Sequence, residues 1–406
     1  MANWNQVTNR PNEANRMSEL PRGRRDALRR AWPLIPAFAV LVAFSIGLSC
    51  TPPGRAAVSG AFFFPDMMAP LPLRPVTWTT NAPIREQTII QYDGRYSMPV
   101  DVYRPGDGKQ HGAMILSPGA PPLAPDDSRL TRLAGDVARA GFVMLIPYSP
   151  DLEAEMIYPR EVDALIAEFQ YLQRQPYVKQ DKIGYIGVSV GSPLALLAAA
   201  DPRINNDVAY VVSFGGYYDA TDVLRSVTTG VISYDGLEES WTPDEHTVDV
   251  MSEQVINRLA DAGDRDVLMR ALVYRQPDAT GDLWRLTPEG RAAFDLLTNH
   301  DPSRVDELLA KLPAEPRQAL RDLSLGGRLQ GLRAETFVLH DTSDHFVPYT
   351  ESRRLRDALQ GQVKLHFTEV DIFEHVEPTV NRDAHTLLTD SAKLYFHLFQ
   401  ILTHFR

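Results

Sequence analysis

The stretch that most constrains the fold is Lys182–Ala200, which reads KIGYIGVSVGSPLALLAAA. An apolar strand pattern, Ile183–Ile186, leads into Gly-Val-Ser-Val-Gly, and a helix pattern rich in alanine and leucine follows directly. A serine at the apex of a sharp strand-to-helix turn has a strained backbone, and the residues two before and two after it must be small so that strand and helix can approach each other. Gly187 and Gly191 meet this requirement around Ser189. The stretch therefore predicts a nucleophile elbow with Ser189 as the nucleophile.

Composition limits the classes of protein that the chain can belong to. Its 406 residues, 44% of them hydrophobic and 23% charged, suit a large globular domain with additional segments. The formal net charge of -11 argues against nucleic acid as a partner. The single cysteine, Cys50, excludes an intramolecular disulfide and a cysteine-based metal cluster, and the histidines lack zinc-site spacing. We expect no metal and no organic cofactor.

The N-terminal residues 1–50 combine an arginine-rich leader with an uncharged stretch, residues 31–51. This order predicts an export signal or a single membrane anchor, with the catalytic part outside the cytoplasm and attachment to the membrane through this segment. The most apolar part, residues 37–48, is short for a spanning helix, which needs about 20 residues, so a signal is favoured over an anchor. Residues 47–50 are similar to a lipoprotein cleavage box, which makes lipidation of Cys50 one alternative. Another alternative is that the uncharged stretch forms a buried hydrophobic helix of the globular domain.

Residues 51–86 are rich in proline and predict a linker. Beyond them, strand and helix patterns alternate in residues 87–216 and again in 334–406, which indicates a mainly parallel sheet with helices on both faces. Between these two parts the alternation of strand and helix patterns is absent. Residues 217–333 carry helix-start signals such as Thr242-Pro243, Thr287-Pro288 and Asp301-Pro302. The predicted fold class is therefore α/β, with an all-helical cap insertion over the active site.

The strand that resumes the sheet ends in the sequence FVLHDTSDHFVP, residues 337–348. Here the chain resembles the α/β-hydrolase superfamily, whose members often carry H-G-x-x-D-x-x-V-P at this point. The resemblance covers about residues 88–406 without the insertion. It implies that Asp344 is the acid of a catalytic triad and that His375, in a loop after the last strand, is the base. Asp341 stands where glycine is common and is interpreted as a turn residue.

The order Ser189, Asp344, His375 is the order that the superfamily uses. Asp219, just after an earlier strand, is the alternative acid. His340 and His345 flank Asp344 and are expected to shape its loop.

Negative charge that develops on a substrate oxygen needs backbone N–H donors. Val190, the residue after the nucleophile, is expected to supply one of them. The superfamily's H-G-x loop corresponds to Pro118-Gly119-Ala120 here, so Ala120 is the expected second donor and Gly119 the next candidate.

These features predict a serine hydrolase that cleaves a carboxylic ester through an acyl-enzyme, similar to the dienelactone-hydrolase and esterase branches of the superfamily. The expected substrate is a small-molecule or lipid-like ester. An exported serine peptidase, an acyltransferase and a non-enzymatic scaffold are the alternatives. Tyr217, Tyr218, Trp241 and Trp284 are candidate pocket residues.

Overall fold

A computed structural model describes residues 80–375, 377–378 and 382–404 of the chain. The predicted leader, with Cys50, and the predicted linker up to residue 79 lie outside the described residues. No helix in the described part is long and apolar enough to cross a membrane. The prediction of export or membrane attachment therefore concerns residues that the structure does not describe.

The core of the described part is an eight-stranded sheet with the strand order β1-β2-β4-β3-β5-β6-β9-β10. Strand β2 runs antiparallel to β1 and to β4, and all pairs from β4 to β10 are parallel. The β1–β2 hairpin turns at Asp93-Gly94, where both residues have positive φ, as the turn signal predicts. The strands are Ile84–Tyr92 (β1), Tyr96–Arg104 (β2), His111–Ser117 (β3), Val143–Pro147 (β4), Val178–Val188 (β5), Tyr210–Phe214 (β6), Glu335–Asp341 (β9) and Leu365–Val370 (β10).

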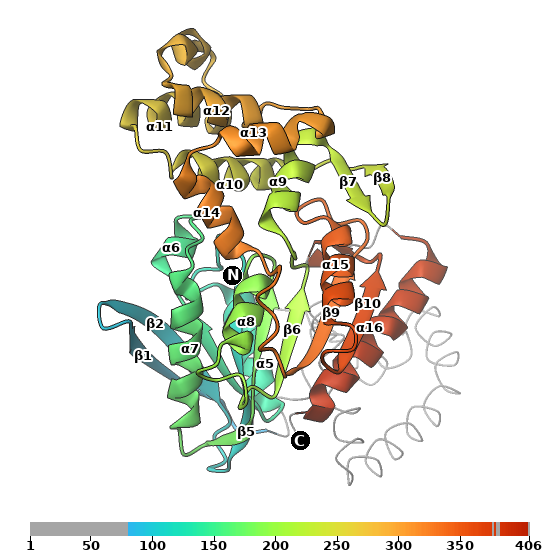
Figure 1. The fold of residues 1–406 in the computed structure, drawn as a ribbon. Coiled ribbons are helices and arrows are strands. Elements are labelled where there is room, and N and C mark those ends of the chain that lie inside the picture. The colour runs from blue at the N-terminus through green and yellow to red at the C-terminus, as the bar shows by residue number, and fades with distance from the viewer. Residues whose placement is uncertain (1–79, 376, 379–381, 405–406) are drawn as a thin grey trace, which may run out of the picture. The chain divides into compact units, whose positions relative to one another are not determined.

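Helices pack on both faces of this sheet (Figure 1). Successive strand residues point to opposite faces, and Val338 and Leu339 of β9 belong to different hydrophobic clusters. Val338 shares a core with α7, α8 and α15, whereas Leu339 packs with Leu394 of α16. The prediction of a mainly parallel sheet covered on both faces is thus confirmed. The helices are Ser128–Arg139 (α5), Pro150–Glu153 (α6), Arg160–Gln173 (α7), Gly191–Ala200 (α8), Tyr349–Leu359 (α15) and Ala384–His404 (α16).

A long insertion, residues 217–333, separates β6 from β9 (Figure 1). Thr287 and Asp301 accept hydrogen bonds from the first turns that follow them, as their sequence context predicts. Helix α10 begins later than expected, because Asp244 and not Thr242 caps it. The elements are Ala220–Thr229 (α9), Val231–Tyr234 (β7), Leu237–Ser240 (β8), Glu245–Ile256 (α10), Ala262–Leu268 (α11), Met269–Val273 (η2), Pro277–Arg285 (η3), Pro288–Leu297 (α12), Pro302–Arg304 (η4), Val305–Lys311 (α13) and Ala314–Leu323 (α14).

The prediction that the insertion is entirely helical is wrong at one place. Strands β7 and β8 form an antiparallel hairpin of their own. Asp235 and Gly236 join them, with φ of 52° and 76°. An Asp-Gly pair between two short strand patterns is a strong hairpin signal, because both residues tolerate a positive φ.

Helix α7, which packs against β5, carries two buried glutamates, Glu161 and Glu168. Both carboxyl oxygens of Glu168 are buried without a hydrogen-bond partner among the described residues, and Glu161 accepts a hydrogen bond of 2.9 Å from Ser149 Oγ. Burial raises the pKa of Glu161 to about 7 and raises the pKa of Glu168 well above its ordinary value. The folded protein therefore keeps these carboxyl groups protonated at pH values at which the unfolded chain releases the protons.

This arrangement predicts that the cost of burying Glu168 grows with pH, because its folded-state pKa exceeds its unfolded-state pKa. We expect Glu168→Met to raise the free energy of unfolding by about 1–3 kcal/mol at pH 8 and by less at pH 5. Denaturant unfolding at both pH values measures the difference. Glu153→Met, at an exposed position of α6, is the control and should show no such dependence. An equal gain at both pH values for Glu168→Met would contradict the prediction.

Candidate active site

Ser189 lies at the turn between β5 and α8 and has a φ of 52°. Its backbone N–H donates to the carbonyl of Phe214 at the end of β6, with an N···O distance of 2.8 Å. The flanking glycines are needed at this turn. A Cβ on Gly187 would lie 2.5 Å from Ser192 Cα, and a Cβ on Gly191 would overlap the carbonyl oxygen of Ser117. The strained serine and its two glycines thus form the strand–turn–helix unit that the sequence predicts.

Asp344 and His375, which are 31 positions apart, lie in direct contact. The distance from His375 Nδ1 to Asp344 Oδ2 is 2.7 Å, and both side chains are buried. His375 has a φ of 62° and follows the short strand Phe373–Glu374 (β11). Its ring stacks on Phe346 with a centroid distance of 4.8 Å. A carboxylate at Nδ1 fixes the imidazole tautomer, so Nε2 is the nitrogen that can accept a proton.

The carboxylate of Asp344 is surrounded by donors. Oδ1 accepts from the backbone N–H groups of Phe346 and Val347 at 2.7 and 2.9 Å. His340 Nε2 lies 3.3 Å from Oδ2. Burial alone would raise the pKa of Asp344, but the hydrogen bonds from His340 and His375 outweigh burial and hold the pKa well below its ordinary value. Asp344 is therefore an anion that can stabilise a protonated His375.

Asp341 connects the loop of Asp344 to the loop of His375. Its Oδ2 accepts from the backbone N–H groups of Ile372 and Phe373 at 2.8 and 2.7 Å. Its Oδ1 accepts from the N–H and the hydroxyl of Ser343 at 2.8 and 2.7 Å. Burial raises the pKa of Asp341, against the hydrogen bonds from Phe373, Ser343 and Ile372, which lower it. The single carboxylate thus fixes two chain segments that are 31 positions apart in sequence.

Ser189 opens into a cavity that is lined mostly by apolar side chains. Ala120 and Val190, the two expected N–H donors, line the same cavity. A Cβ on Gly119 would lie 3.4 Å from Ser189 Cβ, so this loop passes directly beside the serine. In the described part of the chain, the hydroxyl of Ser189 makes no hydrogen bond. The structure therefore joins His375 to Asp344, and it brings Ser189, Ala120 and Val190 together at one cavity.

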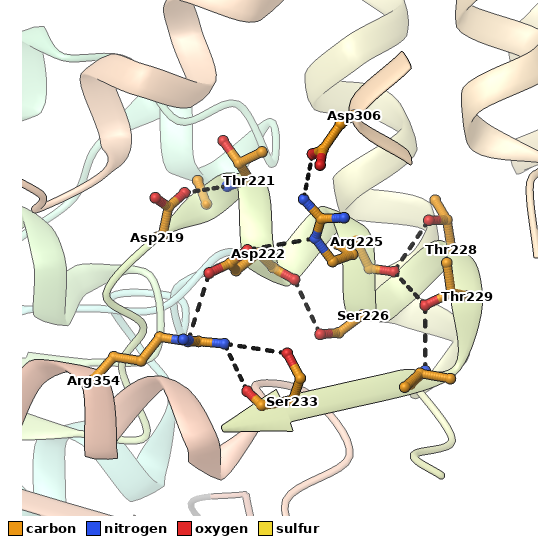
Figure 2. Close-up of polar contacts among 12 residues, drawn as sticks. Asp219, Thr221, Asp222, Arg225, Ser226, Thr228, Thr229, Ser233, Asp306 and Arg354 are labelled. Atoms are coloured by element: carbon orange, nitrogen blue, oxygen red, sulfur yellow. Dashed lines mark hydrogen bonds and ion pairs between the residues drawn. The ribbon is translucent and has the colours of Figure 1, made fainter. Parts of the chain in front are cut away.

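The alternative acid, Asp219, occupies a different position. It caps α9, where its Oδ1 accepts from Thr221 N at 2.7 Å and from Ser324 Oγ at 3.0 Å. Figure 2 shows Asp219 directed at Thr221, in a polar cluster that also contains Arg354. Arg354 donates to the carbonyl of Ser233 at 2.6 Å, which fastens the β7–β8 hairpin to α15 (Figure 2). These contacts make Asp219 a helix-capping residue.

The candidate pocket aromatics have different roles. Tyr217 lines the cavity, and burial raises its pKa. The backbone N–H of Tyr218 donates to Glu351 Oε2. The indole Nε1 of Trp241 donates to the carbonyl of Asp344 at 2.8 Å, so it supports the loop of the acid. Trp284 is 80% exposed and is not among the residues that line the cavity.

The sequence analysis did not predict most of the residues that line the cavity, and among these His246 carries a titratable side chain. His246 of α10 lines the cavity with Ser189, and its Nε2 lies 3.4 Å from the carbonyl oxygen of Ala120. Its only sequence signal is a position in the first turn of a helix that follows a proline. Among the described residues, no cluster of histidine, cysteine and carboxylate side chains is arranged to hold a metal ion.

The strand order and the elbow define an α/β-hydrolase-type fold. A family model described as the C-terminal domain of BAAT and acyl-CoA thioester hydrolases matches residues 167–261, which is less than half of the chain. This segment contains β5, the elbow and α9. The fold and the family match together support a hydrolase.

Several solved structures are similar at low sequence identity. The acylaminoacyl peptidase of Pyrococcus horikoshii is 10% identical with a TM-score of 0.46, and the match covers 81% of this chain and 42% of the peptidase. The dienelactone hydrolase of Anabaena variabilis is 14% identical with a TM-score of 0.40, and the match covers 79% of this chain and 99% of the dienelactone hydrolase. An esterase of Rhizomucor miehei is 14% identical with a TM-score of 0.45, and the match covers 81% of this chain and 88% of the esterase. Identities this low say nothing about activity. No curated protein matches the sequence.

The hydrogen bonds of Asp341 predict that this residue positions His375. We expect Asp341→Asn to lower kcat by about 10–100-fold with little change in KM, because an amide cannot accept from donors on both sides and the loop of His375 shifts. Steady-state kinetics on an ester substrate measures the split. Asp219→Asn is the matched control, since it also removes a carboxylate that accepts several hydrogen bonds. Equal losses of kcat in both variants would contradict the positioning role.

Proposed function

We propose that the protein is a serine hydrolase that cleaves a carboxylic ester through an acyl-enzyme on Ser189. In this proposal Asp344 and His375 complete the triad, and the N–H groups of Val190 and Ala120 bind the oxyanion. The observation that carries the proposal is the 2.7 Å contact between His375 Nδ1 and the buried carboxylate of Asp344. A histidine oriented by a buried carboxylate and a serine at a strained turn that opens into a cavity are the groups that nucleophilic catalysis uses, and they support the proposal.

The reaction follows from the roles of these groups. Ser189 Oγ attacks the carbonyl carbon of the ester while His375 Nε2 takes its proton, and Asp344 stabilises the resulting imidazolium. The carbonyl oxygen becomes an oxyanion that accepts from the N–H groups of Val190 and Ala120. The protonated His375 then gives its proton to the leaving alkoxide as the C–O bond breaks. Water attacks the acyl-enzyme in the same manner, with His375 as base, and releases the acid and Ser189.

The match to a thioester hydrolase model favours a second candidate substrate. The same residues can cleave a thioester, because the attack on the carbonyl carbon is identical and only the leaving group differs. Parallel assays of butyryl-CoA and of p-nitrophenyl butyrate distinguish the two substrates. A kcat/KM for the thioester at least about tenfold higher than for the oxygen ester would favour the thioester.

The location of the protein is also a proposal. We propose that residues 1–50 direct the catalytic part out of the cytoplasm, by export or by anchoring in the membrane. The arginine-rich leader and the uncharged stretch that follows it support this proposal. Protease protection of the full chain in intact cells and in opened cells measures it, because an exported domain is cleaved in both.

The central prediction concerns Ser189. We expect Ser189→Ala to lower ester hydrolysis by at least about 10³-fold, because the variant lacks the hydroxyl that the proposal makes the nucleophile. Hydrolysis of p-nitrophenyl butyrate by the purified full chain measures the loss. Ser192→Ala is the matched control, since this nearby buried serine donates to the carbonyl of Phe214 at 3.3 Å. Activity that survives in Ser189→Ala would refute the proposed function.

A further inference from the structure

The cavity at Ser189 is shaped mainly by the insertion. Three of its helices contribute apolar side chains, and Phe346 and Val347 close the cavity from the loop of Asp344. The face of α10 that lines the cavity changes along the helix, from His246 in its first turn through apolar residues to Gln254 in its last. The aliphatic side chains from the insertion that line the wall are Ala220, Val223, Val250, Met251, Leu320 and Leu323.

The cavity is small. Its volume is about 60 Å³. A dry cavity of about 150 Å³ holds a benzene molecule, which has six carbon atoms. By this scale the space beside Ser189 takes a chain of roughly two to three carbon atoms beyond the reacting carbonyl group.

Hydrogen bonds fix the wall in place. Gln254 accepts from Ile157 N at 3.1 Å and donates to the carbonyl of Glu155 at 2.6 Å. Arg258, one turn further along the chain, is buried and donates to the carbonyl of Ile157 at 2.6 Å. These bonds join the end of α10 to the segment between α6 and α7. Widening the cavity by moving α10 would break them at a cost of buried, unsatisfied groups.

The lining also disfavours a charged ligand. Apart from Ser189, the lining residues that can ionise are His246 and Tyr217. Burial raises the pKa of Tyr217, so it stays neutral, and His246 already faces Glu155, whose Oε2 lies 3.8 Å from its Nδ1. A carboxylate on the ligand would therefore enter an apolar site without a cation to pair with it, which is costly.

We propose that this cavity is the acyl site and that it selects a short and uncharged acyl group, so that the substrate is an ester of an acid with about three to four carbons. This inference rests on the proposed function, because it takes Ser189 as the nucleophile. Val250 and Leu320 both line this site, and the alcohol part of the ester lies outside it.

A series of p-nitrophenyl esters tests the inference on the full chain. We expect kcat/KM to be highest for the propionate or the butyrate and at least tenfold lower for the octanoate. The hydrogen succinate, which has the butyrate's chain length and adds a carboxylate, should also be at least tenfold worse than the butyrate. Wild-type protein that hydrolyses the octanoate or the succinate as well as the butyrate would overturn the inference.

Two variants change the size of the site in opposite directions. Leu320→Ala should raise the ratio of hexanoate to butyrate hydrolysis about tenfold or more, since each buried methylene contributes about fourfold. Val250→Phe should lower butyrate hydrolysis more than acetate hydrolysis. Leu308→Ala is the matched control, because Leu308 is a buried leucine of α13 that does not line the cavity. A ratio that changes equally in Leu320→Ala and Leu308→Ala would overturn the inference.

Binding to Ser189→Ala separates this inference from the proposed function. This variant keeps the cavity and lacks the proposed nucleophile, so calorimetry can measure its Kd for intact butyrate and octanoate esters. Tighter binding of the butyrate supports the acyl site, even if the wild-type protein proves not to cleave esters through Ser189. Equal or tighter binding of the octanoate rules the acyl site out, even if Ser189 proves to be the nucleophile.

Discussion

The parallel pairing of β5, β6 and β9 is the constraint on which the candidate site depends. Val188 lies opposite Phe214, and Phe214 lies opposite Leu339, so β5 and β6 end at the same level and β9 continues two residues further, to Asp341. The backbone continues this pairing beyond the strands, because Ser189 N donates to Phe214 and Gly215 N donates to Leu339. A slip of one residue would turn each of these strands over, since side chains alternate between the faces. The register therefore decides whether the serine turn and the loop of Asp344 meet at one edge.

The backbone after β6 is packed so closely against His375 that a side chain at Gly215 would crowd the imidazole. Gly215 has a φ of 60°, and a Cβ on it would lie 3.1 Å from Cε1 of His375. The imidazole thus lies directly against the backbone that follows β6, where its Nδ1 meets the carboxylate of Asp344. Asp341 adds a second restraint, because its carboxylate accepts hydrogen bonds from the backbone N–H groups of Ile372 and Phe373, shortly before His375 in the chain. Together these contacts restrain the position of His375.

The sequence predicted the parts of the fold that depend on local patterns. The sheet strands, the Asp93-Gly94 turn and the caps at Thr287 and Asp301 follow from alternation, turn residues and capping signals within a few positions. The hairpin β7–β8 was missed because its strands are only four residues each and lie among helix signals. The roles of Asp341 and His246 could not be predicted. Their partners lie 31 and 126 positions away, and no local pattern encodes such a contact.

The proposed catalytic residues and the cavity wall come from different parts of the chain, and this separation affects which substitutions the protein can accept. The proposed proton-transfer residues come from loops at the strand ends, whereas most of the cavity wall comes from α9, α10 and α14. Gln254 and Arg258 attach that wall to backbone carbonyl groups, which exist whatever the side chains around them are. Substitutions on the inner faces of these helices can therefore alter which molecules are accepted while the chemistry at the strand ends is preserved. Proteins that descend from such a chain can therefore change their substrate range while they keep the same residues at the strand ends.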